Sequence, residues 1–63
     1  MNIHKKKILE FLKKERVITS SEIAKYIQVS WNTAEKYLLE LVIDGYIEKI
    51  KKEGVNLWVE KKQ

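Results

Sequence analysis

Two helix-start signals that lie eleven residues apart constrain this chain more than any other feature. The first is the T-x-x-E spacing of Thr19 and Glu22, in which the threonine hydroxyl accepts a backbone N–H and the carboxylate reaches back. The second is Ser30, a residue type favoured at the N-cap position. Between the two signals lie three apolar residues at helical spacing, Ile23, Ala24 and Ile27. The pattern predicts a short helix from about residue 20, a tight turn and a second helix.

The second helix is expected to be longer than the first. After Trp31, apolar residues recur at helical spacing at Ala34, Leu38 and Leu41. Gly45 then supplies the left-handed backbone conformation on which helices commonly end. The pattern predicts a helix over residues 31–44.

Further elements are expected on both sides of this helix pair. An apolar stripe through Ile8 and Leu12 predicts a first helix over about residues 3–15, and the β-branched pair Val17–Ile18 predicts a short strand. Residues 46–51 and 55–61 are rich in β-favouring side chains, and Gly54 between them permits the turn of a hairpin. We therefore expect one α+β domain over residues 1–63, with three helices, a short first strand and a C-terminal two-stranded β-hairpin.

Composition narrows the classes of function. The chain of 63 residues contains no Cys and one His, so neither a disulfide framework nor a thiolate metal site is expected, and a cytoplasmic location is the default. Charged residues interrupt every apolar run, so neither a secretory signal nor a membrane span is expected. The formal net charge of +4 favours a polyanionic partner such as nucleic acid.

An enzyme or a metalloprotein is not expected. His4 is the single imidazole and Asp44 the single aspartate, and the serines are explained as helix caps. No nucleophile, base and orienting group can be combined from these residues, and no metal-ligand spacing is present. We expect no cofactor, no metal and no small-molecule ligand, and we expect His4 to be a solvated surface residue.

The stretch from Thr19 to Ile47, TSSEIAKYIQVSWNTAEKYLLELVIDGYI, resembles the winged helix-turn-helix domains of bacterial and archaeal transcription regulators. The resemblance rests on the small-residue cap, the V-S-x-x-T turn and the L-x-x-L-x-x-x-G-x-I finish. It implies a double-stranded DNA-binding protein that presents the helix beginning at residue 30 to the major groove. The terminal hairpin corresponds to the wing of that fold and is called the wing below.

The same resemblance marks the contact residues. On the helix-turn-helix these are Ser30, Trp31, Asn32, Thr33, Glu35 and Lys36, and on the wing they are Lys51, Lys52 and Asn56. Asn32 suits adenine, and Lys36 suits guanine or a phosphate. Phosphates repel the Glu35 carboxylate unless it accepts from a cytosine amino group or pairs with Lys36 or Lys25, so its contribution to DNA binding is expected to be indirect. Trp31 stands where a polar residue is common, and it either faces DNA or folds back into the core.

The far end of the same helix carries extra apolar residues. Leu39, Val42 and Ile43 lie outside the inward stripe, which predicts a homodimer contact that could also include the first helix or Trp58. The alternative is that the wing covers these side chains within one chain. The competing functions are a winged helix used as a protein-contact scaffold and a DNA-binding protein without sequence preference.

Overall fold

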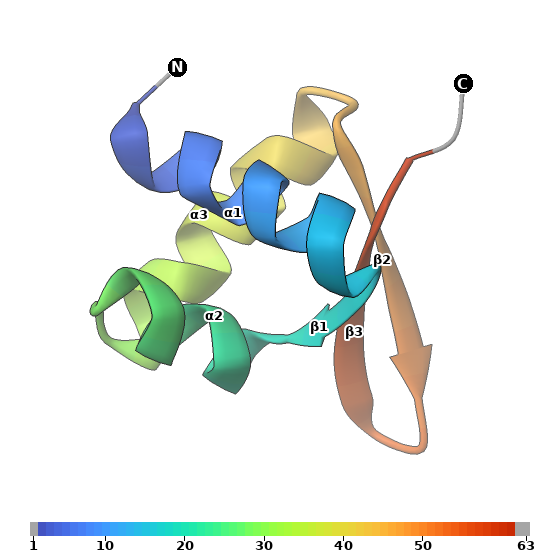
Figure 1. Ribbon diagram of the computed structural model, residues 1–63. Coiled ribbons are helices and arrows are strands. Elements are labelled where there is room, and N and C mark those ends of the chain that lie inside the picture. The colour runs from blue at the N-terminus through green and yellow to red at the C-terminus, as the bar shows by residue number, and fades with distance from the viewer. Residues whose placement is uncertain (1, 62–63) are drawn as a thin grey trace.

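The first half of the chain folds as a helix, a short strand and a second helix (Figure 1). In the computed structural model, which describes residues 2–61, α1 spans Ile3–Glu15, β1 spans Val17–Thr19 and α2 spans Ser20–Ile27. Asn2 caps α1 by accepting the backbone N–H of Lys5 at 2.8 Å, a cap that sequence reasoning missed. The capping box before α2 is confirmed, because the Thr19 hydroxyl accepts the Glu22 backbone N–H at 3.2 Å and the Glu22 carboxylate accepts the Thr19 backbone N–H at 2.8 Å.

The second half consists of the longer helix and the wing. Helix α3 spans Trp31–Ile43, one residue shorter than predicted, and the chain leaves it through Gly45 at a φ of 86°. Strands β2, Ile47–Lys52, and β3, Val55–Glu60, are joined by a two-residue turn in which Glu53 and Gly54 have φ values of 52° and 79°. Positive φ at both turn residues matches the twist of a tight hairpin. The predicted α+β architecture of three helices, a short first strand and a terminal hairpin is confirmed.

The three strands form one antiparallel sheet in the order β1-β3-β2. All three helices lie on the same side of this sheet (Figure 1). Residues opposite each other in an antiparallel pair share a face, and successive residues alternate between faces. The register pairs Ile18 and Lys49 with Trp58, so these three residues share the face toward the helices, called the inner face. Val17 and Glu48 pair with Val59 on the opposite, outer face.

The core lies between the inner face and the helices. Its largest fully buried side chain is Trp58, which is 0% exposed. The other members come from the three helices and from β1 and β2, namely Ile8, Leu12, Ile18, Ile23, Ala24, Ile27, Ala34, Leu38, Leu41 and Ile47. The prediction that Trp58 takes part in a dimer contact is therefore wrong, because the side chain stabilises the monomer and has no surface to offer a partner.

No helix within residues 2–61 is long and apolar enough to cross a membrane.

Candidate functional site

The turn between α2 and α3 fixes where α3 begins. Helix α2 ends at Gln28 in the left-handed conformation, with φ 59° and ψ 51°, and the N–H of Val29 then donates to the Ala24 carbonyl at 3.0 Å. Ser30 caps α3 by accepting the backbone N–H of Thr33 at 3.2 Å, and its hydroxyl donates to the Thr33 hydroxyl at 2.9 Å. Both hydroxyl groups thus have local partners, and the first turn of α3 starts at the protein surface.

One stripe of α3 points away from the core. Ala34, Leu38 and Leu41 are 0% exposed and define its inner side. At 3.6 residues per turn, positions 32, 36, 39 and 43 share the opposite side. Asn32 and Lys36, at the front of this stripe, are exposed. This brings together two of the residues that the resemblance assigns to DNA.

Glu35 has a partner inside the protein. The indole N–H of Trp58 on β3 donates to the Ser20 hydroxyl at 2.9 Å, and that hydroxyl donates to the Glu35 carboxylate. Ser20 is only 4% exposed, so the chain of hydrogen bonds is shielded from water. It joins the wing, the start of α2 and the front of α3. Glu35 therefore holds the front of α3 against its neighbours, and its part in DNA contact stays a prediction.

Trp31 lies between the two positions considered from the sequence. Its side chain is 51% exposed, so it is not part of the core. It borders a hollow of about 220 Å³ that is also lined by residues of the α2 start and of the wing, namely Thr19, Ser20, Ser21, Gly54, Val55 and Asn56. The front of α3 and the tip of the wing are therefore neighbours on one surface. Asn56, which the resemblance marks as a contact residue, faces the same hollow.

The register of the wing separates the two lysines predicted there. Lys51 pairs with Asn56, two positions from the Lys49–Trp58 pair, so it lies on the inner face of the strands. Lys52 pairs with Val55 and lies on the outer face. Lys49 was not predicted as a site residue, although the alternation of β2 places it beside Lys51. Its ammonium group lies over the Trp58 ring, 5.9 Å from the centroid, in a cation–π arrangement.

The opposite end of α3 is tied to α1. Lys5 Nζ lies 2.8 Å from the Glu40 carboxylate. This hydrogen bond raises the pKa of Lys5 above its ordinary value and lowers the pKa of Glu40. His4 packs beside Tyr37 with ring centroids 5.4 Å apart, and its Nδ1 is buried without a hydrogen-bond partner among the described residues. The expectation that His4 is a solvated surface residue is wrong, because this ring contact half-buries it.

The residues predicted for a dimer contact differ in exposure. Ile43 is 82% exposed and Leu39 is 42% exposed, whereas Val42 is partly buried against the core. The wing therefore leaves Leu39 and Ile43 uncovered. Within residues 2–61, no group of three or more His, Cys, Asp or Glu side chains is placed to hold a metal ion.

Comparison with protein families identifies a match to one family model. A family model described as "Winged helix-turn-helix DNA-binding" matches residues 1–48. The matched segment runs from α1 through α3 to the second residue of β2, so it contains the helix-turn-helix and most of the chain. A search of curated proteins found no match.

Proposed function

Because this chain belongs to the winged helix-turn-helix DNA-binding family, we propose that it binds double-stranded DNA with the front of α3 in the major groove and the wing beside the phosphate backbone. One observation carries the proposal beyond family membership. The hollow bordered by Trp31 of α3 and Asn56 of the wing joins the two predicted contact regions into one surface.

Side chains on this surface have the chemistry that DNA requires. Asn32 is exposed and presents an amide that pairs with the N6 and N7 edge of adenine. Lys36, one turn further along the stripe, donates to guanine or to a phosphate. Ser30 and Thr33 lie at the amino end of α3, where the helix dipole and free N–H groups favour a phosphate oxygen. The inner-face lysines of the wing, Lys49 and Lys51, supply phosphate contacts.

We further propose that the protein reads sequence and acts as a transcription regulator, in the cytoplasm and without catalytic activity of its own. The test is selection of duplexes from a random pool, followed by titration of the selected duplex and a scrambled one. We expect Asn32→Ala to weaken the selected duplex by about 1 to 3 kcal/mol, because a bidentate base contact is lost, and to leave the scrambled duplex unchanged.

Two outcomes separate the alternatives. Equal affinity for both duplexes, with steep dependence on salt, would instead support an architectural protein without sequence preference. No binding to either duplex at low salt would support a protein-contact scaffold. Lys25→Ala is the control for a substitution outside the proposed DNA surface, because this residue of α2 is exposed and was not assigned to that surface.

A homodimer is also part of the proposal, and the end of α3 is the first of two surfaces that could form it. A domain of this size buries only about 60% of its unfolded surface, so a second copy would add stability. The contact surface predicted from the sequence retains Leu39 and Ile43, which are exposed. Both residues continue the α3 stripe that begins with Asn32 and Lys36, so a partner bound there would lie next to the DNA.

A further inference from the structure

The outer face of the sheet carries several exposed apolar side chains. Five apolar side chains from three strands lie on it. Val17, Ile50 and Val55 are 48%, 44% and 48% exposed, and Leu57 and Val59 are half-buried. The helices all lie on the other side of the sheet, so no helix within residues 2–61 covers this face (Figure 1). A contiguous apolar surface of this kind is typical of a protein contact.

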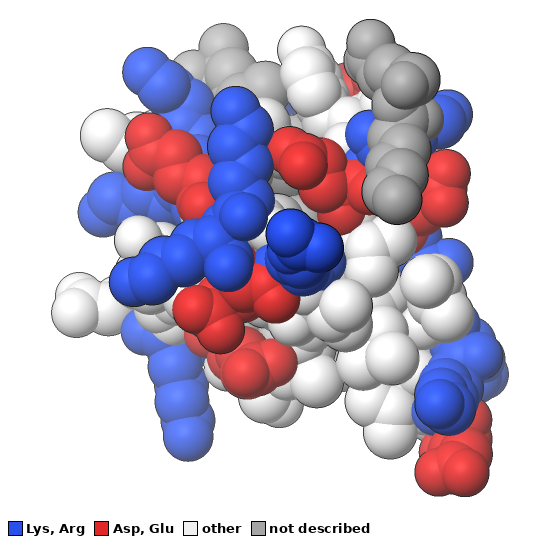
Figure 2. Space-filling model, turned by 45° about the vertical axis from the view of Figure 1, so that its right-hand side comes forward, with Lys and Arg blue, Asp and Glu red and all other residues white. Residues whose placement is uncertain are grey.

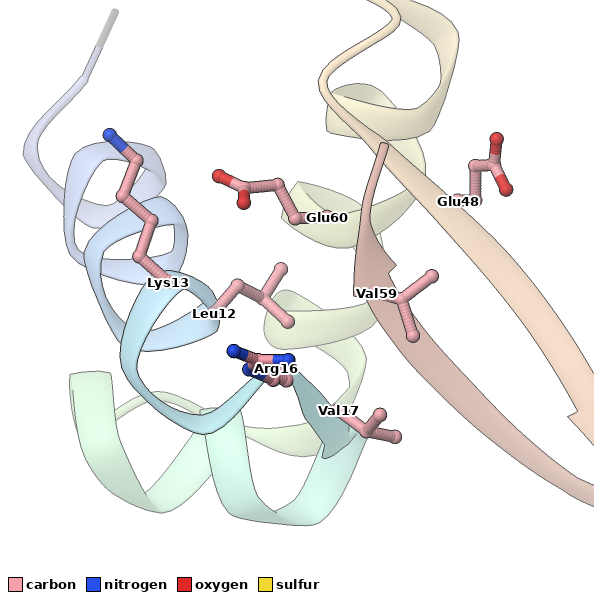
Figure 3. A pocket seen from close by; sticks show the side chains of 7 residues that line it. All are labelled: Leu12, Lys13, Arg16, Val17, Glu48, Val59 and Glu60. Atoms are coloured by element: carbon pink, nitrogen blue, oxygen red, sulfur yellow. The ribbon is translucent and has the colours of Figure 1, made fainter. Parts of the chain in front are cut away.

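Charges of opposite sign lie at the two edges of the outer face. Val17, Val59 and Glu48 form one row across β1, β3 and β2, so Glu48 lies at the β2 edge. Arg16 precedes Val17 at the β1 edge. These residues and Lys13 line one hollow of about 600 Å³ at the junction with α1 (Figure 3).

Neither of these edge charges is neutralised within the described chain. The ion pair found among residues 2–61 joins Lys5 of α1 to Glu40 of α3 and involves no residue of the sheet. In Figure 2, charged side chains gather over α1 and at the hairpin turn, and largely uncharged surface lies between them. The outer face thus presents an apolar centre with Arg16 at the β1 edge. At the β2 edge it carries Glu48 and, nearer the hairpin turn, Lys52.

We infer that this outer face binds a second copy of the same chain. A twofold axis that runs parallel to β3, above its centre, brings the β1 edge of one copy over the β2 edge of the other. Arg16 of each copy then faces the partner's Glu48, and Val59 and Leu57 lie against their own counterparts. An isologous contact requires such self-complementarity, and two aligned sheets pack face to face about 10 Å apart.

This surface suits a second copy better than the end of α3 does. Leu39 and Ile43 are two side chains on one helix, and the charges nearest to them along α3 include Glu40, which is already paired with Lys5. The outer face offers five apolar side chains, and a second copy pairs Arg16 with Glu48. The contact area is nevertheless small, since a face of three short strands measures roughly 10 Å by 20 Å, so that two copies together bury about 400 Å². This is below the area of about 1,200 Å² that stable interfaces bury, and we therefore expect a weak dimer that forms only at high protein concentration.

Sedimentation equilibrium of the 63-residue chain without DNA tests the inference. Across a concentration range from about 10 μM to 1 mM, where weak interfaces associate, we expect the wild type to pass from monomer to dimer. Val17→Glu places a carboxylate opposite the partner's Glu48 and should leave the chain monomeric over the whole range. Ile43→Glu is the matched control at the other exposed apolar site and should dimerise like the wild type.

Charge reversal tests the pairing itself. Arg16→Glu and Glu48→Arg should each be monomeric alone, because each sets like charges against each other twice. Mixed together, the two variants restore both pairs and should form a heterodimer, which also shows that both are folded. A wild type that stays monomeric, or a mixture without heterodimer, overturns the inference. Dissociation by Ile43→Glu but not by Val17→Glu would overturn it in favour of the α3 end. DNA binding has no part in these measurements, so they are independent of the proposed DNA binding. A wild type that stays monomeric would contradict both the outer-face dimer and the homodimer proposed above.

Discussion

The two faces of the sheet use alternate residues of the same strands for different purposes. On the inner face, Trp58 is fully buried and donates a hydrogen bond to Ser20, and the Lys49 ammonium group lies over its ring. On the outer face, Val59 and Ile50 remain partly or largely accessible and have no helix above them. One residue step along a strand therefore separates a core position from an unpartnered one.

This difference shows how a short wing can contribute side chains to two separate surfaces of the protein. The period of two in a β-strand sends neighbouring side chains to opposite faces. The inner face fixes the wing against α2 and α3, and towards the hairpin turn it continues into the proposed DNA surface at Lys51 and Asn56. The outer face remains available for a partner. The following predictions test this division, beginning with the largest effect.

Replacing the central inner-face residue should have the largest effect on folding. Trp58→Ala removes the largest buried side chain and should lower the free energy of unfolding by about 3 to 5 kcal/mol. The neighbouring outer-face substitution Val59→Ala should lower it by about 1 kcal/mol, because that side chain is only half-buried. Urea unfolding followed by far-UV circular dichroism measures both. Similar losses for the two variants would contradict the division between the faces.

Removing the hydroxyl that links the wing to α3 should have an intermediate effect. Ser20→Ala leaves the Trp58 indole N–H and the Glu35 carboxylate without their shared partner, and should cost about 1 to 3 kcal/mol of stability. The matched control is Ser21→Ala, an exposed neighbour at the start of the same helix, for which we expect a change within about 0.5 kcal/mol. Equal melting temperatures for the two variants would mean that the network does not stabilise the fold.

Two adjacent wing lysines should differ in their effect on DNA binding. Lys51 lies on the inner face with Asn56, so Lys51→Ala should weaken all duplexes and reduce the slope of log affinity against log salt by about 1. Lys52 lies on the outer face, and Lys52→Ala should change that slope less. Fluorescence anisotropy titrations at several salt concentrations provide the slopes. A larger effect from Lys52 would show that the wing presents its other face to DNA.

The smallest expected effect on stability is that of the ion pair between Lys5 of α1 and Glu40 of α3, which lies on neither face of the sheet. Because the Lys5 contact lowers the pKa of Glu40, the pair stabilises the folded state above the ordinary glutamate pKa of about 4.5. That contribution is lost as the pH falls through the lowered value. Glu40→Gln should therefore melt slightly below the wild type at pH 7, and the gap should close at strongly acidic pH. A gap that stays constant with pH would exclude the ion pair as its cause.

The element boundaries could be predicted from the sequence because short-range signals set them. The Thr19–Glu22 capping box, the Ser30 cap and the left-handed Gly45 each act within four residues of themselves. The exposure of Asn32 and Lys36 could also be predicted, since it follows from the spacing of Ala34, Leu38 and Leu41. A local pattern is sufficient for each of these features.

Other features depend on residues far apart in the chain. Trp58 is of a residue type that is common at protein contacts. Only the register of β3 against β1 and β2 places its side chain in the core. Glu35 has no local signal for its partner, because Ser20 lies fifteen residues earlier and belongs to another helix. The faces of Lys49, Lys51 and Lys52 likewise follow from strand pairing.

The sequence by itself determined the helices, their caps, the wing and the exposed front of α3, because each depends on contacts within a turn or two of chain. The tertiary structure alone decided which side of each strand faces the helices, and hence which wing residues are buried, which join the surface around Trp31 and which remain open on the outer face. The physical reason is the period of two along a strand. A shift of one residue in register exchanges the two faces, and that register is fixed by packing between distant segments.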